Sequence, residues 1–162
     1  MRMVAFDRMV ASLPGKERVA RSFGIPIRIH ATGAETGGAI GIWDSYLEPG
    51  GGPHWHTHTL ETEAFRVISG DFRFWCGDLV LEGGPGTTVT LPPHVPHRWE
   101  NIGTTPGQMI GIVSPGGFEA FFIEMERTGA NTPAEVLAIE TAFGIINSGL
   151  ADVVAGRGDG RS

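Results

Sequence analysis

The sequence predicts a mainly β domain, either a small barrel or a two-sheet sandwich, with short helices near its carboxyl end. The 25 glycines and 11 prolines are dispersed between short apolar runs, which is typical of many short strands joined by turns. Several of these runs alternate apolar and polar residues, as half-buried strands do. With 162 residues, 41% of them hydrophobic, the chain is long enough for one domain with its own core.

About eight strands are expected, which suits such a barrel or sandwich. They occupy residues 25–31, 39–47, 62–69, 71–76, 79–82, 87–91, 97–102 and 108–114. The loop Gly83-Gly84-Pro85-Gly86 resembles a phosphate-binding loop only in its glycines. A helix should follow a phosphate cradle, whereas the strand-like TTVTL follows here, so this loop is predicted to be a tight turn.

Two helices are expected after the last strand. In residues 118–127 (FEAFFIEMER) the apolar side chains recur at offsets of three and four, which gives a helix one apolar face. In the following TPAEVLAIETAFG, Thr132 is a suitable N-cap and Pro133 suits the first helical position. Glu135 completes a capping box, and Gly144 ends the helix. Both helices are expected to dock on the barrel.

The chain shows no internal repeat and no boundary between two globular domains. We expect an amino-terminal extension (1–24), the barrel (25–115), a helical segment that packs on it (116–148) and a flexible tail (149–162).

Charge and cysteine content exclude several classes of function. A net charge of −6 and a pI of about 5.4 argue against nucleic acid or an anionic membrane as a partner. The single cysteine, Cys76, cannot form an internal disulfide or a thiolate zinc site. No apolar stretch reaches the length of a signal peptide or of a membrane span. We therefore predict a soluble, cytoplasmic protein.

Five of the six histidines fall in two short stretches, GGGPHWHTHTLETE and LPPHVPHRWEN. In a strand, residues i and i+2 face the same side, nearly 7 Å apart at a rise of about 3.3 Å per residue. Two imidazoles from His54, His56 and His58 can therefore converge on one ion, but three cannot do so easily. A carboxylate, Glu61 or Glu63, must then return to the same interior. The pattern predicts a metal site.

These stretches resemble the two motifs of the cupin superfamily. The first reads Gly50-x5-His56-x-His58-x4-Glu63-x6-Gly70, and the second reads Gly86-x5-Pro92-x-His94-x2-His97-x3-Asn101. His94 stands where the motif has Gly, a position that needs positive φ, which His tolerates better than most residues. The chain is similar to single-domain quercetin-dioxygenase-like cupins from about Ala31 into the carboxyl-terminal helix.

The resemblance implies a double-stranded β-helix, or jelly-roll, barrel with one divalent metal inside. Its ligands would be His56, His58, Glu63 and His97, and His54 would lie at the mouth or on the surface. Three imidazoles and one carboxylate suit Fe, Ni, Co, Cu, Mn or Zn, with one or two coordination positions open. Glu63 is either a permanent ligand or also the catalytic base. Glu61, in the turn, is expected to point away.

Strand alternation also predicts the wall of the pocket. Phe65 on the Glu63 strand, Trp99 on the His97 strand and Phe74 on the strand between them should face inward. Core packing is the commoner role of such residues, since a small barrel fills its own interior. Asn101 is expected to be a turn or backbone hydrogen-bonding residue.

The open metal positions favour a small substrate that chelates through two adjacent oxygens, such as a flavonol, catechol or diketone. The resemblance and the aromatic interior favour a metal-dependent, dioxygenase-like oxidoreductase. A metal-dependent isomerase or lyase and a non-catalytic small-molecule-binding cupin are the alternatives. Family resemblance and open sheet edges further imply a homodimer.

Overall fold

Alternation of inward and outward residues builds a six-stranded antiparallel sheet. In the computed structural model, which describes residues 6–155, burial alternates along β5 (Thr62–Ser69) and β10 (Gly107–Ser114), as expected for strands with one face on a core. The other members are β1 (Arg18–Ser22), β2 (Ile25–Ala31), β3 (Gly41–Leu47) and β8 (Thr88–Leu91). The order across the sheet is β1-β2-β3-β10-β5-β8.

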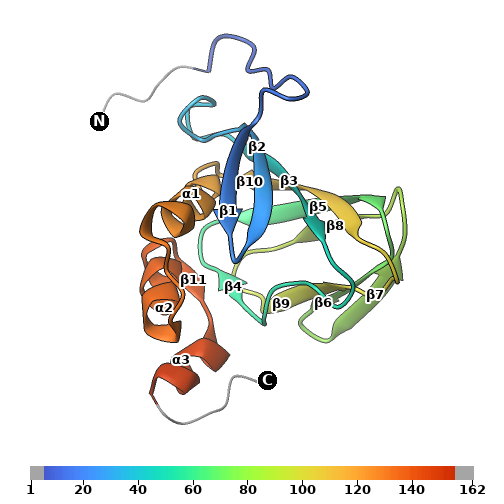
Figure 1. Cartoon of the computed structure of the whole chain (residues 1–162), viewed down its shortest axis with the longest axis vertical. Coiled ribbons are helices and arrows are strands. Elements are labelled where there is room, and N and C mark those ends of the chain that lie inside the picture. Colours follow the sequence, from blue (N-terminus) through green and yellow to red (C-terminus); the bar gives the residue numbers. More distant parts are fainter. Residues whose placement is uncertain (1–5, 156–162) are drawn as a thin grey trace.

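A three-stranded sheet faces this one (Figure 1). It consists of β6 (Phe72–Cys76), flanked by β7 (Leu79–Gly83) and β9 (His97–Asn101). A short pair, β4 (Thr57–His58) with β11 (Ile145–Ile146), joins the chain after the helices to the segment that carries the clustered histidines. The predicted mainly β, jelly-roll architecture is confirmed.

All eight predicted strands are present, and two of them, β2 and β5, have the predicted limits. Strand β1 differs from expectation, because it lies inside the segment 1–24 that the sequence suggested was an extension. Its sequence RVARS buries only Ala20 and Ser22, so it has no apolar alternation and is recognised only by its pairing with β2. The expected tail, 149–162, begins inside helix α3 (Ser148–Val154), and residues 156–162 lie outside the described part of the chain.

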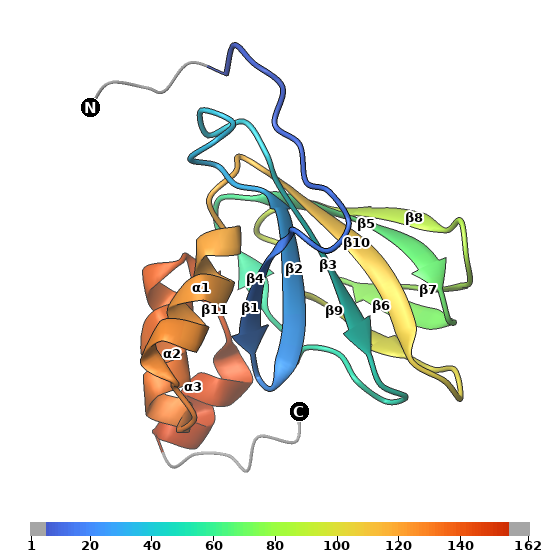
Figure 2. The same cartoon turned by 45° about the horizontal axis from the view of Figure 1, so that its top comes forward.

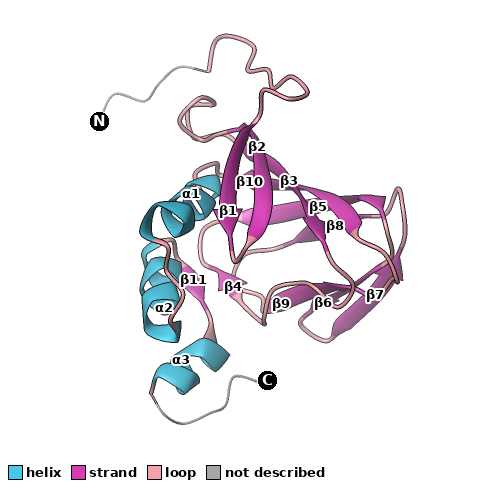
Figure 3. Ribbon diagram, viewed as in Figure 1, coloured by secondary structure: helices cyan, strands magenta, loops and turns pink. Residues whose placement is uncertain are grey.

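The helices gather on one side of the strands, as Figures 2 and 3 show. Helix α1 (Glu119–Thr128) buries Phe121 and Met125 on one face. Helix α2 (Pro133–Ala142) has the predicted capping box: Thr132 accepts a hydrogen bond from the Glu135 N–H, and the Glu135 side chain accepts from the Thr132 N–H. None of the helices in residues 6–155 is both long and apolar enough to cross a membrane.

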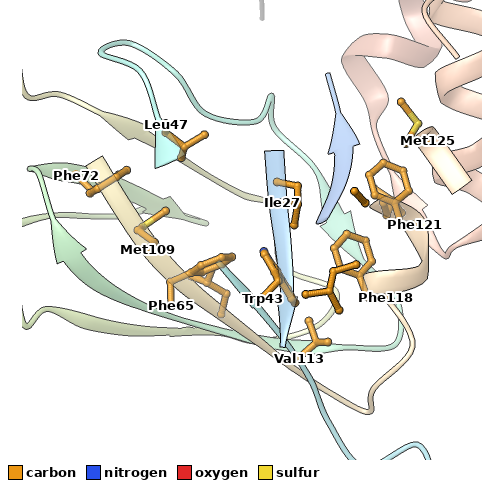
Figure 4. Close-up of a cluster of buried hydrophobic side chains, with 14 of the residues drawn as sticks. Ile27, Trp43, Leu47, Phe65, Phe72, Met109, Val113, Phe118, Phe121 and Met125 are labelled. Atoms are coloured by element: carbon orange, nitrogen blue, oxygen red, sulfur yellow. The ribbon is translucent and has the colours of Figure 1, made fainter. Parts of the chain in front are cut away.

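The core joins the large sheet to the helical layer. Trp43 of β3 and Phe65 of β5 belong to the same buried cluster as Phe118 and Phe121 at the start of α1 (Figure 4). The Trp43 ring lies 6.2 Å from that of Phe65 and 5.8 Å from that of Phe118, distances at which aromatic pairs attract. The helices are therefore part of the packed interior.

Two predicted turns have the expected backbone. The Thr87 N–H donates to the Gly84 carbonyl (3.0 Å) with φ of 91° at Gly86, which is the tight turn expected after β7. His94 has φ of 65°, as required where the motif has Gly.

Candidate metal centre

Four side chains from three neighbouring segments converge between the two sheets. His58 belongs to β4 and His56 precedes it by two residues, so both point to the same side. Glu63 lies on β5, and His97 begins β9. The His56 and His97 backbones exchange hydrogen bonds of 3.1 and 2.9 Å, which holds the two histidine segments together. One donor atom from each of the four residues lies within 4.8 Å of the others.

Each of the three histidine rings is held in place by a hydrogen bond at its Nδ1. The His56 Nδ1 lies 2.9 Å from the His54 carbonyl, and the His97 Nδ1 lies 2.9 Å from the Val95 carbonyl. A carbonyl only accepts, so each of these Nδ1 atoms carries the proton and each Nε2 presents a lone pair. The His58 Nδ1 lies 3.2 Å from a carboxylate oxygen of Glu61, which selects the same tautomer.

The centre is therefore a set of acceptors that face one another. The Glu63 Oε2 lies 3.1 Å from the His97 Nε2 and 3.5 Å from the His58 Nε2, and that second nitrogen has no hydrogen-bond partner among residues 6–155. His58, Glu63 and His97 are all at most 1% exposed. Buried acceptors without a donor are costly, and a shared cation removes that cost. Two ligand atoms that each lie about 2.1 Å from one ion are at most about 4.2 Å apart. The four ligand atoms, now within 4.8 Å of one another, would need to move only slightly closer together to bind such an ion. The four residues fit a divalent metal.

Two opposing effects, burial and the charge of neighbouring groups, set the pKa values of these side chains. Burial lowers the pKa of His56 to about 4, which keeps its imidazole neutral. Burial acts the same way on His58, but the hydrogen bond to Glu61 and the charge of Glu63 outweigh it and raise the pKa. For Glu63, burial raises the pKa, but the adjacent His97 imidazole, which donates a hydrogen bond to the carboxylate when it is protonated, and the other nearby imidazoles lower the pKa by a larger amount, so the carboxylate stays ionised.

Glu61 does not point away, contrary to the expectation from its place in the turn. It is 6% exposed, and its carboxylate lies behind His58, on the side of the imidazole opposite the centre. Carboxylate–histidine–metal arrangements of this kind fix the ring and raise its basicity. The turn between β4 and β5 folds the side chain inward, which no periodic pattern predicts.

The segment that holds the centre matches a known protein family. Residues 43–113, which contain all four residues of the centre, match the Cupin_2 family, described as a cupin domain. The chain carries a cupin domain.

Relatives of this cupin domain are distant. A stretch of 67 residues, 41% of this chain, is 28% identical to quercetin 2,3-dioxygenase of Bacillus subtilis (strain 168) and spans only 20% of that protein. An RmlC-like cupin from Shewanella frigidimarina NCIMB 400 superimposes with a TM-score of 0.59 at 17% identity, over 70% of this chain and 96% of the other. For KdgF from Halomonas sp. the TM-score is 0.59 at 16% identity, over 68% and 98%. These two likenesses support the fold alone.

A cavity of about 360 Å³ opens beside the centre of the cupin domain. His56 and Glu63 form part of its wall, so the donor set borders space for a ligand. Phe65 and Trp99 line the cavity, as the strand alternation suggested, and their rings lie 4.2 Å apart. Trp43 of β3 lines it as well.

Phe74 is the exception among the predicted pocket residues. It is 3% exposed and packs in the core 6.2 Å from the Phe72 ring, but it is not among the residues that line the cavity. The inward direction expected from alternation is correct, and Phe74 lies opposite Trp99 in the pairing of β6 with β9, but only Trp99 reaches the cavity. Phe74 is a core residue.

The remaining histidines of the two motifs have supporting places. His54 is exposed at the cavity wall and contributes its carbonyl to His56, as expected for a residue of the mouth. His94 is exposed, and its N–H donates to the His58 carbonyl at 2.8 Å. Asn101 is fully buried, and its side-chain amide donates to the carbonyls of Leu47 and Thr105, which confirms the structural role expected for it.

Sequence reasoning missed three polar residues of the cavity wall. Ser22 comes from β1, Glu140 from the last turn of α2, and Asn147 from the segment before α3. All three are at least nine-tenths buried. They lie outside both cupin motifs and in elements read as an extension or as packing helices, so only the folded arrangement brings them to the cavity.

Proposed function

We propose that this cupin is a metal-dependent, dioxygenase-like enzyme that acts on a small substrate with two adjacent oxygens, such as a flavonol, catechol or diketone. The observation that carries the proposal is the aromatic cavity of about 360 Å³ directly beside the His56–Glu63 side of the centre. This volume lies near the lower limit of about 300 Å³ for ligand pockets, so it suits a small planar molecule. The partial likeness to a quercetin 2,3-dioxygenase supports the same choice.

Each residue has a defined part in this proposal. His56, His58, Glu63 and His97 hold one divalent transition metal, of the group Fe, Ni, Co, Cu, Mn and Zn. Such a metal supplies Lewis acidity to the substrate oxygens bound to it. Glu63 is placed to take the proton of the chelating hydroxyl. Phe65 and Trp99 hold the apolar body of the substrate and exclude water.

Oxygen consumption tests the proposal. Protein reconstituted separately with each of the six metals is mixed with flavonols, catechols and β-diketones, and dissolved oxygen is followed with an electrode. We expect uptake with at least one metal and one substrate class, and none in the His97→Ala variant. If no combination consumes oxygen above the rate of the free metal, the dioxygenase assignment fails.

A metal-dependent isomerase or lyase is the second candidate. Such enzymes use polar groups to move protons within the substrate, and the buried Glu140 beside the cavity is a group of this kind. The same screen separates the two functions, because an isomerase or lyase converts its substrate without oxygen uptake.

The two roles of Glu63 are separated by the Glu63→Gln variant. If Glu63 only holds the metal, saturating metal should restore much of the activity. If it is also the base, activity should remain about 10²–10⁴-fold lower at saturating metal, the range typical of general base catalysis. We expect the second result. An acidic limb of the pH–rate profile that is the same in variant and wild type would exclude Glu63 as the base.

We further propose that this protein is cytoplasmic and that it forms a homodimer. Strand β7 is an edge of its sheet, and it carries three consecutive exposed apolar residues, Leu79 (76% exposed), Val80 (59%) and Leu81 (50%). Apolar edge strands tend to pair with another chain. Light scattering should give twice the chain mass of 17.3 kDa, and Val80→Lys should shift it toward a single chain. A wild-type mass of one chain at micromolar concentration would contradict the proposal.

A further inference from the structure

Two buried polar atoms beside the cavity lack partners, although neither belongs to the metal centre. They are the Oγ of Ser22 and the Oε2 of Glu140, and neither has a hydrogen-bond partner within the described part of the chain. Ser22 is 3% exposed and Glu140 is 8% exposed. Both residues line the same cavity as His56 and Glu63. Buried polar atoms are nearly always paired, so two unpaired ones at one cavity mark a position where a polar group held in the cavity can pair with them.

The fold holds the Glu140 carboxyl at this wall through its neighbours. Asn147 donates to the Glu140 Oε1 at 3.5 Å, and the Asn147 Oδ1 in turn accepts from the Leu150 N–H at 3.0 Å. This network engages one carboxyl oxygen and leaves the other, Oε2, free.

The chain then returns directly to the metal-binding segment. Ile145 of β11 pairs with His58 of β4, and Figure 1 shows β11 between α2 and β4. The end of α2 is therefore tied to the strand that carries a ligand of the centre. Glu140 is placed in a fixed relation to the metal site even though it lies far from Glu63 in the sequence.

We propose that Glu140, together with Ser22, binds a hydroxyl group of the substrate other than the two oxygens that chelate the metal. This inference rests on the proposed function and deepens it, because it defines the substrate as a chelating ring compound with an additional hydroxyl. Burial raises the pKa of the Glu140 carboxyl, against the hydrogen bond from Asn147 and the nearby His58, which favours the protonated form. A carboxyl in that form both donates and accepts, as a hydroxyl does, so the two are complementary.

Matched ligands test the inference without any turnover. The protein is loaded with Zn(II), which has no redox chemistry. It is titrated with 3-hydroxyflavone, 3,3′-dihydroxyflavone and 3,4′-dihydroxyflavone, and binding is followed by the absorption change on chelation. We expect at least one dihydroxyflavone to bind roughly 3- to 10-fold more tightly than 3-hydroxyflavone, the effect of one neutral hydrogen bond.

The decisive quantity is the affinity of the tighter-binding dihydroxyflavone divided by that of 3-hydroxyflavone, because a general disturbance of the site weakens the binding of all three ligands equally. In Glu140→Leu the ratio should fall to about 1, and in Ser22→Ala it should fall part of the way. Glu140→Gln, which retains an amide at the same place, should keep an intermediate ratio. The control Glu48→Gln, at an exposed position outside the cavity, should leave the ratio unchanged.

The outcomes separate this inference from the proposed function. Equal binding of all three flavones to wild type, or a preference that survives Glu140→Leu, would overturn the inference alone and leave the chelating-substrate proposal in place. Absence of binding by any flavone to the zinc-loaded wild type would overturn the inference and remove flavonols from the substrates of the proposed function. Loss of binding in His97→Ala would confirm that the wild-type signal comes from chelation at the centre.

Discussion

Removal of the Glu61 carboxylate is expected to weaken metal binding although Glu61 is not a ligand. Its oxygen lies 3.2 Å from the His58 Nδ1, and the pair is almost fully buried. In Glu61→Ala, His58 loses the group that holds its ring and its tautomer. Partners of this type typically account for about 10- to 100-fold in metal affinity, which is about 1.4–2.7 kcal/mol.

The geometry favours the lower part of that range. Charge-assisted hydrogen bonds between nitrogen and oxygen are typically about 2.7–2.9 Å long, so the distance of 3.2 Å indicates a weaker bond. We therefore expect about a tenfold loss in Glu61→Ala. Glu61→Gln keeps an acceptor oxygen without the charge, and a loss of roughly threefold is expected there.

Competition with a chromophoric chelator for Zn(II) measures both losses, and circular dichroism checks that each variant is folded. Glu48→Ala is the matched control, since Glu48 is an exposed glutamate outside the cavity wall. A Zn(II) affinity of folded Glu61→Ala that equals that of Glu48→Ala would refute the argument that this carboxylate supports His58.

Three further predictions concern the centre, the acid stability and the second helix. Wild type should carry about one equivalent of transition metal by elemental analysis, His97→Ala should lose it, and His54→Ala should retain it; metal retained in His97→Ala would exclude the four-residue centre. Burial raises the pKa of Asp44, but hydrogen bonds to Arg28 and other partners lower it by a larger amount, so the net pKa is below the ordinary 3.8. The stability that Asp44 contributes is therefore present above pH 3.8 and is lost as the pH falls through the lowered pKa. Asp44→Asn should therefore cost about 2 kcal/mol in urea unfolding at pH 7, and less near pH 3, whereas an equal cost at both would contradict this. Thr132→Ala should cost about 1 kcal/mol through loss of the N-cap, and an unchanged midpoint would contradict that role.

Strand and helix positions were predictable because they depend on local patterns. The alternation in 62–69 and the capping box at Thr132 involve residues a few positions apart, and both are present as predicted. Strand β1 was not predictable in this way. Its identity as a strand comes from hydrogen bonds to β2, and its own five residues bury only two side chains.

The same distinction holds for the candidate site. His56 and His58 converge because residues two apart in a strand face the same side, and the motif spacing brings Glu63 and His97 to them. Phe74 follows the same alternation and lies opposite Trp99, but it does not line the cavity, since alternation predicts which face a residue occupies and not which neighbours its side chain packs against.

The sequence by itself determined the mainly β class, most of the strands, the capped helix and the four residues able to hold a metal. The class, the strands and the helix follow from periodicity within short segments, where chain geometry leaves few alternatives. The four candidate ligands came from the resemblance to the cupin motifs, because periodicity alone left open which two of the three clustered histidines converge and whether Glu61 or Glu63 joins them. Only the tertiary structure decided that Glu61 turns inward behind His58, and that β1 and α2 bring Ser22 and Glu140 to the cavity. Such contacts depend on how distant segments pack, and the sequence carries no periodic signal for them because turns and packed helix ends are oriented by their neighbours.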